Sequence, residues 1–462
     1  MNIIIIKTQG DENMNNQTYL QSQNERESNA RSYPRRIPIA IDKADGIYVT
    51  DVEGNKYLDC LAGAGTLALG HNHPVVIEAI EDVLHHQRPL HTLDITTPMK
   101  EEFVNEIYDS LPEAFAKRAK IQFCGPTGSD AIEAAVKLVK TATGRSGMLS
   151  FQGGYHGMTN GALGMMGNIG PKEKVANVMS DVQFLPYPYA YRCPFGVGGK
   201  QGTAISSNYI ERLLTNPEGG VPKPAGMVME LVQGEGGAVP APTDWVKEMR
   251  RITKEQGIPL ILDEVQTGIG RTGKMFAFEH ADITPDVLVL SKAIGGTLPL
   301  SVVIYDEKLD TWAPGAHSGT FRGNQMAIAA GTATLQYVKQ HQLDRHAEAM
   351  GDQLMNDLKK IQTHTNTIGN VRGRGLMIGV EIVNPSLSAD SIGSHPEYPE
   401  MAKQIQKECF DRGLILELGG RYGSVVRFLP PLIITKEQVE EVSSIFHHAV
   451  EAAENKLLTQ LV

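Results

Sequence analysis

The middle of the chain alternates short apolar runs with longer segments of helical periodicity. The runs KIQFCG, AGMVMEL, IPLILDE, DVLVLSK and PLSVVIYDE each have the length and composition of a buried strand. Between them, GPTGSDAIEAAVKLVKTATG predicts a helix that begins after Thr127 and stops at Gly144, and TDWVKEMRRITKEQG predicts one capped by Thr243. Strands that are apolar throughout and separated by helices predict an α/β fold with a mostly parallel central sheet covered on both faces.

The flanking segments predict a second, smaller unit. DGIYVTDVEGNKYLDC, residues 45–60, has the pattern of a hairpin that turns at EGN, and the glycine-rich LAGAGTLALGHNHP after it predicts an irregular loop. A helical pattern runs from residue 324 to about 360, and a βα arrangement follows RGRGLMIGVEIV. We expect a disordered leader, a large domain, and a smaller α+β domain formed jointly by both ends of the chain. These parts cover residues 1–24, then 96–350, and then 25–95 together with 351–462.

Composition narrows the class of protein. The 462 residues carry a formal net charge of −10, which argues against nucleic acid as a partner, because phosphate binding needs clustered Lys and Arg. No stretch reaches the roughly 18 apolar residues of a membrane-spanning helix, so no membrane partner is expected. The four cysteines are scattered and form no CxxC pair. We therefore expect free thiols in the reducing cytoplasm and no metal site.

Polar residues follow four of the predicted strands directly, and these strands are expected to be neighbours. They are Gly128 and Ser129 after KIQFCG, Glu230 in AGMVMEL, Asp263 to Gln266 in IPLILDEVQ, and Lys292 after DVLVL. In an open parallel sheet, ligands bind outside the carboxyl ends of the strands, so these residues should meet at one edge. Lysine is seldom buried without a partner. Either Lys292 forms a structural ion pair with Asp263, or the strand delivers it to a ligand.

Pyridoxal phosphate, PLP, is a ligand that uses all of these groups. Its aldehyde condenses with a lysine amine, its ring nitrogen needs a carboxylate, and its phosphate needs backbone N–H donors. Lys292 and Asp263 meet the first two needs, and the helix N-terminus at Gly128 and Ser129 meets the third. The glycine-rich turn matches neither the P-loop nor GxGxxG, which disfavours nucleotides. The sequence therefore predicts a PLP enzyme with Lys292 and Asp263 as catalytic residues.

The ordered motifs also resemble a known family. DEVQTGIGRTG and the lysine of LSKAIGG, with GPTGSDA, FQGGYHG, ELVQGEGG, HSGTFRGNQ and VVRFLPPL, are similar to the class III, omega-type aminotransferases of PLP fold type I from about residue 35 onward. The resemblance implies a homodimer with two shared active sites whose substrates are small amino and keto acids. It also implies cofactor contacts: Tyr155 stacking on the ring with His156 beside it, Val265 on the other face, Gln266 on the ring hydroxyl, and Thr320 on the phosphate of the other subunit's cofactor. Glu230 is expected among the cofactor-binding residues from its place at a strand end.

The resemblance places substrate recognition at Arg427 of VVRFLPPL, which corresponds to the arginine that binds a substrate carboxylate. An arginine fork suits a carboxylate because it makes two parallel charge-assisted bonds. Glu235 of QGEGG resembles a switch partner that neutralises Arg427 when the amine is distal and moves aside for glutamate or 2-oxoglutarate. A permanent salt bridge between the two is the alternative.

The run YHGMTNGALGMMGN bears on the amine donor. The 4-aminobutyrate and ornithine branches of the family commonly carry arginine where Met158 stands, so methionine there argues against 4-aminobutyrate. This run, with SNARSYPRR and CLAGAGTLALGHNHP, resembles the branch that transfers the 4-amino group of L-2,4-diaminobutyrate to 2-oxoglutarate. Met158 and Gly65 are then the expected neighbours of the donor. Another omega-amino donor such as ornithine, acetylornithine or 4-aminobutyrate, a PLP mutase or decarboxylase, and a PLP-binding regulator are the alternatives.

Overall fold

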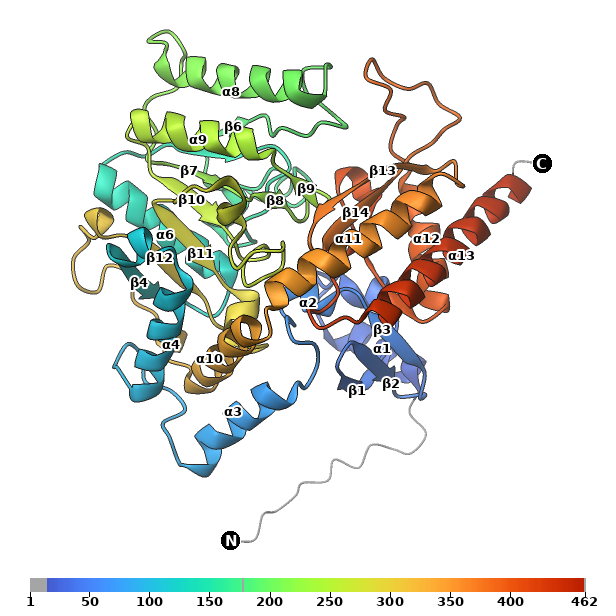
Figure 1. The fold of residues 1–462 in the computed structure, drawn as a ribbon, viewed down its shortest axis with the longest axis horizontal. Helices are drawn as coiled ribbons and strands as arrows, with labels where there is room; N and C mark the ends of the chain where they lie inside the picture. The colour runs from blue at the N-terminus through green and yellow to red at the C-terminus, as the bar shows by residue number, and fades with distance from the viewer. Residues whose placement is uncertain (1–14, 177, 461–462) are drawn as a thin grey trace.

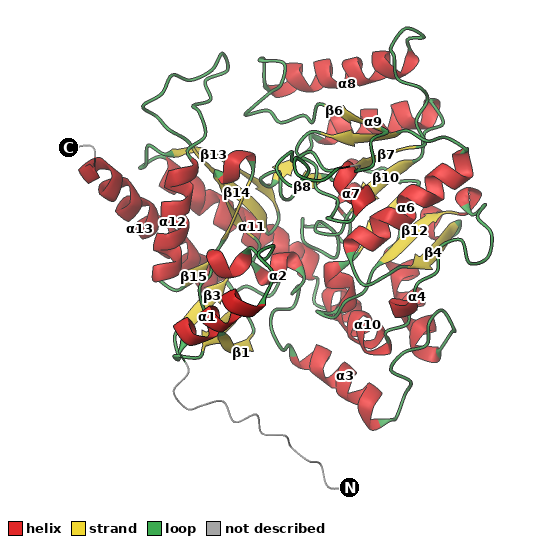
Figure 2. Cartoon of the chain, turned by 180° about the vertical axis from the view of Figure 1, so that it is seen from behind, coloured by secondary structure: helices red, strands yellow, loops and turns green. Residues whose placement is uncertain are grey.

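The chain folds into two parts around three main sheets. The computed structural model describes residues 15–176 and 178–460. One part is built on a seven-stranded sheet and the other on two four-stranded sheets (Figure 1). Helix α2 (Ala62–Gly65) lies between the two parts in both views (Figures 1 and 2). Within the described ranges, no helix is both long and apolar enough to cross a lipid bilayer.

The seven-stranded sheet has the order β4-β12-β11-β10-β7-β5-β6. β12 is antiparallel to both of its neighbours and every other pair is parallel, which confirms the predicted mostly parallel sheet. β5, β7, β10, β11 and β12 are buried at every position, as strands covered on both faces must be. The strands are β4 (Ala119–Phe123), β5 (Met148–Phe151), β6 (Val182–Leu185), β7 (Gly226–Met229), β10 (Leu260–Asp263), β11 (Val287–Leu290) and β12 (Val302–Asp306).

Helices cover both faces of this sheet, and alternate residues of a strand enter opposite cores. In β10, Leu260 and Leu262 belong to one cluster of buried apolar side chains and Ile261 to another, following the two-residue period of a strand. α6 supplies much of the second cluster, whereas α4, α9 and α10 contribute to the first. The elements of this part are α4 (Pro98–Ser110), α5 (Glu113–Ala116), α6 (Gly128–Thr143), α7 (Asn160–Gly164), α8 (Gly199–Thr215), β8 (Val232–Gln233), β9 (Val239–Pro240), α9 (Thr243–Glu255) and α10 (Gln325–Gln340).

The smaller part joins segments that are far apart in the sequence. Its first sheet has the order β1-β2-β3-β15, in which β15 pairs in parallel with β3, and its second is the antiparallel sheet β13-β14-β17-β16. Blue and red segments therefore lie side by side in Figure 1. The predicted hairpin is confirmed as β2 and β3. The elements are β1 (Ile41–Asp45), β2 (Tyr48–Asp51), β3 (Lys56–Asp59), α11 (Leu343–Gln362), β13 (Ile368–Arg374), β14 (Met377–Ile382), α12 (Pro399–Asp411), β15 (Leu414–Ile415), β16 (Glu417–Gly419), β17 (Val425–Phe428) and α13 (Lys436–Gln460).

The structure differs from the sequence-based expectation at the N-terminal leader and at the predicted helix cap. Residues 1–14 of the leader lie outside the described residues, and the rest is not disordered but belongs to helix α1 (Asn16–Arg26), which Asn15 caps through its side chain. Thr243 begins α9 without capping it, because Pro242 occupies the cap position. Thr127 does cap α6 as predicted.

Two helices fall on the other side of the expected domain boundaries. α3 (Pro74–His85), expected with the smaller domain, packs against α10. The helical pattern that starts near residue 324 is two helices, since Gln342, with a left-handed φ of 50°, turns the chain between α10 and α11. α11 packs against β13 and α13, so the expected boundary at residue 350 falls inside a helix of the smaller part.

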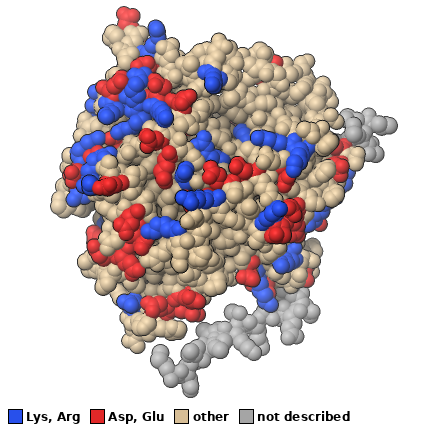
Figure 3. Space-filling model, in the orientation of Figure 1, with Lys and Arg blue, Asp and Glu red and all other residues tan. Residues whose placement is uncertain are grey.

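Charged side chains of both signs are interspersed on the face shown in Figure 3. Over α8 and α9, for example, Arg251 pairs with Glu211, Glu248 and Glu255. On this face, such a mixed distribution does not concentrate positive potential in the way that a phosphate backbone requires.

Candidate active site

The carboxyl ends of β7, β10 and β11 open into a cavity of about 370 Å³. These three strands are parallel neighbours, so their ends lie at one edge of the sheet, as the sequence predicts. The lining residues come from these strand ends, the start of α6 and two loops; they are Thr66, Pro126, Thr127, Gly128, Ser129, Tyr155, His156, Gly157, Glu230, Glu235, Asp263, Val265, Gln266, Ser291, Lys292, Thr297, Leu298, Pro299 and Leu300.

The fourth strand, β4, reaches this cavity by a different route. β12 lies between β4 and β11, so the prediction of four neighbouring strands is wrong. An apolar run identifies a strand but carries no information on its place or direction in the sheet, which is why the sequence misplaced it. The loop after β4 nevertheless carries the N-terminus of α6 to the cavity, where Gly128 and Ser129 line it.

The start of α6 is arranged to receive an anion. Thr127 Oγ1 accepts a hydrogen bond from the Asp130 N–H at 3.3 Å, and Asp130 Oδ2 accepts one from the Thr127 N–H at 3.1 Å. The first N–H groups of a helix have no partner inside it, and they favour a phosphate. Space beside them depends on glycine: a Cβ at Gly157, where φ is +124°, would lie 2.0 Å from Ser129 Oγ.

Lys292 follows β11 with an unusual backbone. Its φ of 51° lies in the left-handed region, which costs a non-glycine residue about 1–2 kcal/mol. The half-buried side chain lines the cavity, and no residue in 15–176 or 178–460 forms an ion pair with it. Burial lowers the pKa of the amine, and the negative charge of Glu235 opposes that shift only in part. A lysine with a lowered pKa is a better nucleophile and base.

Asp263, at the end of β10, is paired with a histidine and not with Lys292. His156 Nδ1 donates to Asp263 Oδ2 at 2.8 Å, and the Val265 N–H donates to Oδ1 at 3.1 Å. Both side chains of the pair are buried, with 1% of His156 and 6% of Asp263 exposed. Burial lowers the pKa of His156, but the hydrogen bond and charge of Asp263 outweigh burial and raise it. The structural ion pair between Asp263 and Lys292 that the sequence left open is therefore absent from this structure.

The other carboxylates at the strand ends accept hydrogen bonds from backbone N–H groups. Glu230 lines the cavity, but its two oxygens accept hydrogen bonds from the N–H groups of Tyr155 and Gly234, each at 2.9 Å. It thereby ties together two loops at the site, and burial raises its pKa. Glu264 accepts from the N–H groups of Ala277 and Phe278 at 2.7 and 2.9 Å. Asp263 thus differs from both in having a side chain, not only backbone, as a hydrogen-bond partner.

Arg427, on β17, reaches the edge of the site from the smaller part. Its side chain is 1% exposed, Nη1 donates to Glu235 Oε1 at 2.6 Å, and Nη2 donates to Gln266 Oε1 at 3.1 Å. Burial raises the pKa of Glu235, but the charge and hydrogen bond of Arg427 outweigh burial and hold it below its usual range. Gln266 also donates to the Ala64 carbonyl at 2.9 Å. The expected contact between Glu235 and Arg427 is present, and its role as a switch stays a prediction.

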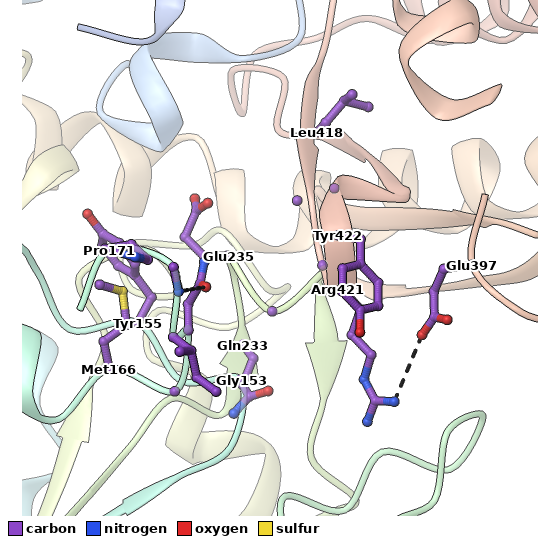
Figure 4. Close-up of a pocket in the computed structure, with 18 of the residues that line it drawn as sticks. Gly153, Tyr155, Met166, Pro171, Gln233, Glu235, Glu397, Leu418, Arg421 and Tyr422 are labelled. Carbon is purple, nitrogen blue, oxygen red and sulfur yellow. Dashed lines mark hydrogen bonds and ion pairs between the residues drawn. The ribbon is translucent and has the colours of Figure 1, made fainter. Parts of the chain in front are cut away.

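A larger cavity of about 1580 Å³ adjoins the first, because Tyr155 and Glu235 line both. Figure 4 shows these two residues on one side of it and Arg421 with Glu397 on the other, where they form an ion pair of 3.9 Å. Its wall carries six cationic side chains and four carboxylates, Glu173, Glu235, Glu397 and Asp411, a modest excess of positive charge that suits acidic substrates. The cationic side chains are those of Arg35, Arg36, Arg192, Lys403, Lys407 and Arg421.

Besides Arg427, three residues expected at the site line neither cavity. Thr320 is exposed in the 3-10 helix η5 (Thr320–Arg322). Met158 is 56% exposed, and it is its backbone N–H that donates to Ser129 Oγ at 3.3 Å. Gly65, at φ +91°, lies behind Gln266, where an added Cβ would be 3.4 Å from Gln266 Cγ. The contacts predicted for these three side chains stay predictions.

Two residues of the site were not predicted from the sequence. Glu417, on β16, has Oε2 3.2 Å from Arg427 Nη1, and the Tyr33 hydroxyl donates to its Oε1 at 3.1 Å. Glu417 interrupts the apolar run LILELGG, the same signal that marked Asp263 as buried. Tyr33 has no comparable local signal, since 384 residues separate it from Glu417.

The groups around the smaller cavity fit PLP. Lys292 supplies an amine with no ion-pair partner in the described part of the chain, and Asp263 supplies a carboxylate oriented by His156. The N-terminus of α6 supplies donors for a phosphate, and Tyr155 and Val265 supply an aromatic and an apolar wall. Across the described residues, no group of three or more His, Cys, Asp or Glu side chains is placed to hold a metal ion.

The chain is similar to known proteins over most of its length. The model of a family described as aminotransferase class-III matches residues 29–450. A protein from Rhizobium meliloti named diaminobutyrate–2-oxoglutarate aminotransferase is 56% identical over 94% of this chain and 93% of its own. One of the same name from Haemophilus influenzae is 50% identical over 94% and 95%. The solved structure of an amine transaminase from an uncultivated Pseudomonas species, in its PLP-bound form, has a TM-score of 0.81 at 27% identity, covering 92% of this chain and 96% of its own.

Proposed function

The chain belongs to the class III aminotransferases, with the architecture of PLP fold type I, and from this premise we propose that it transfers the 4-amino group of L-2,4-diaminobutyrate to 2-oxoglutarate with PLP as its cofactor. The products are L-aspartate 4-semialdehyde and L-glutamate, in either direction. The observation that carries the proposal is Lys292, which lines the cavity beside the Asp263–His156 pair without an ion-pair partner among the described residues. The names of the relatives from Rhizobium meliloti and Haemophilus influenzae support the donor.

The residues around the smaller cavity hold the cofactor and move a proton. PLP, when bound, supplies an electron-withdrawing ring and an aldehyde that carries the amino group. Lys292 Nζ would hold that aldehyde and, when free, would accept the proton from the donor C4 and deliver it to the cofactor, a role that its lowered pKa favours. Asp263 would keep the ring nitrogen protonated, and His156 holds the orientation of that carboxylate. The N–H groups of Gly128 and Ser129 would hold the phosphate.

Arg427 and Glu235 let one site accept both substrates. The α-carboxylate of 2-oxoglutarate binds the Arg427 guanidinium through two parallel bonds. Glu235, which is 38% exposed, gives up its 2.6 Å contact with Arg427 for this substrate and keeps it when the donor is bound. Glu417 Oε2 lies 3.2 Å from the same Arg427 Nη1, so the buried guanidinium keeps a carboxylate partner when Glu235 moves aside.

A panel of amine donors is expected to single out L-2,4-diaminobutyrate. PLP-saturated protein is mixed with each donor without keto acid, and the absorbance change of the cofactor on amination gives the rate of the first half-reaction. Because one methylene in a shaped site changes kcat/KM by roughly 10–200-fold, diaminobutyrate should exceed ornithine, acetylornithine and 4-aminobutyrate by at least about 10-fold. A higher value for any of these donors contradicts the proposed donor. Turnover that needs no keto acid would instead indicate a mutase or decarboxylase.

The proposal includes a cytoplasmic homodimer with two shared sites. Thr320 is exposed and lines neither cavity of its own chain, which supports its acting in the site of a second subunit. Free thiols at Cys60, Cys124, Cys193 and Cys409 support a reducing compartment.

Co-expression of two variants, one weakened in PLP binding and one inactive, tests the shared sites. The Thr320→Ala protein is expected to bind PLP roughly 10-fold more weakly, through loss of a hydrogen bond to a charged group, and Lys292→Ala is expected to be inactive. A mixed dimer should contain one intact site, built from Lys292 of one chain and Thr320 of the other. Activity at limiting PLP should therefore exceed the sum of the two variants expressed separately. Activity equal to that sum would contradict shared sites.

A further inference from the structure

Glu417 is a buried carboxylate beside the active site that the reaction described above does not use. It lies on β16 directly across from Arg427 on β17, in register. Its side chain is 8% exposed. The Tyr33 hydroxyl donates to Oε1 at 3.1 Å, while Oε2 receives no hydrogen bond from the described residues and has Arg427 Nη1 at 3.2 Å. Glu417 Oε2 can therefore accept a hydrogen bond from a ligand.

Charge balance indicates that this carboxylate is in excess. Arg427 carries one positive charge, and it faces two carboxylates, since Glu235 Oε1 already accepts its Nη1 hydrogen bond at 2.6 Å. The positive charge of Lys292 also acts on both carboxylates, but Lys292 forms an ion pair with neither of them. Its Nη2 is taken by Gln266 at 3.1 Å. A buried carboxylate without a full cationic partner is costly unless a ligand supplies the positive charge. Burial accordingly raises the pKa of Glu417, although the charge of Arg427 opposes this.

Glu417 itself lines neither cavity, but residues next to it do. Leu418, which follows Glu417 in the sequence, lines the larger cavity and is labelled there in Figure 4. Glu235, which shares Arg427 Nη1 with Glu417, lines both cavities. Tyr33, which is 45% exposed, covers Glu417. A ligand cation next to Tyr33 would meet a hydroxyl oxygen that can accept a hydrogen bond as well as the carboxylate.

The proposed substrates differ in one group that matches this site. L-2,4-diaminobutyrate carries an α-ammonium in addition to the amino group that reacts, whereas 4-aminobutyrate and 2-oxoglutarate have none. We propose that Glu417, held in place by Tyr33, binds the α-ammonium of the donor and makes the enzyme selective for α,ω-diamino acids over ω-amino acids that lack the α-amine. This inference rests on the proposed function and names the residue that determines its donor class.

The Glu417→Gln variant tests this inference because glutamine keeps the shape and removes the charge. PLP-saturated wild type and variant are compared on two donor pairs that differ only in the α-amine: L-2,4-diaminobutyrate with 4-aminobutyrate, and L-ornithine with 5-aminopentanoate. For each pair, the donor ratio is kcat/KM for the diamino acid divided by kcat/KM for the ω-amino acid without the α-amine. In the pair whose diamino acid is the better wild-type donor, this ratio should be roughly 10- to 100-fold lower in Glu417→Gln than in wild type, the range expected for a hydrogen bond to a charged group. The loss should appear mainly in KM.

Two controls separate recognition from structure. The half-reaction with 2-oxoglutarate should lose no kcat/KM in Glu417→Gln, because this substrate has no ammonium and the change removes a carboxylate that competes for Arg427 Nη1. Retained activity in this half-reaction also shows that the variant is folded and holds its cofactor. Glu78→Gln, at an exposed carboxylate that lines neither cavity, changes the net charge equally and should leave the donor ratio unchanged. Tyr33→Phe, which removes the hydroxyl, should lower the ratio less than Glu417→Gln.

The outcomes distinguish this inference from the proposed function. An unchanged donor ratio in Glu417→Gln, or an equal loss in the donor and 2-oxoglutarate half-reactions, overturns the role of Glu417 and leaves the proposed function standing. A wild type that prefers ornithine overturns the proposed donor, and the ornithine pair then still measures the effect of Glu417. A wild type that favours the ω-amino acid in both pairs overturns this inference as well.

Discussion

Lys292→Ala is expected to lower the rate of both half-reactions by at least about 10⁴-fold, because it removes both the nucleophile that binds the cofactor and the group that moves the proton. The measurement is a single turnover of PLP-loaded protein with donor alone, followed by the change in cofactor absorbance. In wild type, reduction with borohydride should leave the cofactor fixed to Lys292, detectable by mass spectrometry of that peptide, and in the variant it should not.

An exposed lysine provides the matched control. Lys274 is exposed and lines neither cavity, so Lys274→Ala should retain wild-type rates. The cofactor-free Lys292→Ala protein should be at least as stable as wild type, because a half-buried amine without an ion pair among the described residues opposes folding wherever it is charged. Transamination by Lys292→Ala near the wild-type rate would refute the assignment of this lysine.

Asp263→Asn is expected to lower kcat by about 10²–10³-fold, the loss typical of removing one preorganised electrostatic group from an active site. Asparagine has the same shape, but its neutral amide cannot keep the ring nitrogen protonated. Proton removal from the donor should then limit the overall rate more strongly. The kinetic isotope effect on kcat, measured with donor that carries deuterium at C4, should therefore be larger in the variant than in wild type. Asp282→Asn, the same change at an exposed residue whose left-handed φ asparagine tolerates, should have no effect.

His156 gives a second measurement on the same variant. Asp263 raises the pKa of His156 against the opposing effect of burial, so in Asp263→Asn the histidine should titrate at lower pH, which NMR of its ring can follow. The raised pKa in wild type stabilises the fold below the ordinary histidine pKa, and that contribution is lost as the pH rises through the raised value. A His156 titration that is the same in both proteins would contradict the coupling between the two side chains.

The placement of Lys292 and Asp263 was predictable because their signals are local. Each ends a short apolar run, and a charged residue in that setting must lie at the end of a buried strand, which the structure confirms for β11 and β10. The start of α6 was predictable for the same reason, since Thr127 and Asp130 are three residues apart and form the expected capping box. The roles of these residues in catalysis stay predictions until the variants are measured.

The rest of the site depends on contacts that no short window of sequence contains. His156 and Asp263 are 107 residues apart, so the local sequence does not identify the histidine as the partner of this carboxylate. It suggests Lys292 as the possible ion-pair partner instead. Strand order is also a long-range property, which is why the antiparallel β12 between β4 and β11 was missed. Glu417 belongs to the site only because Arg427 lies across from it on the neighbouring strand. These relations follow from the fold as a whole and not from local propensity.

The parallel pairing of β3 (Lys56–Asp59) with β15 (Leu414–Ile415) affects how the protein is made. During synthesis, the first sheet stays incomplete, because β15 is synthesised hundreds of residues after β3. Until that strand arrives, one side of β3 offers unpaired backbone groups, which is a template for aggregation. Contacts of such long sequence separation also slow folding. A nascent chain that ends before β15 therefore cannot complete its first sheet, and β3 keeps an unpaired edge. Protection by chaperones would matter most at that stage.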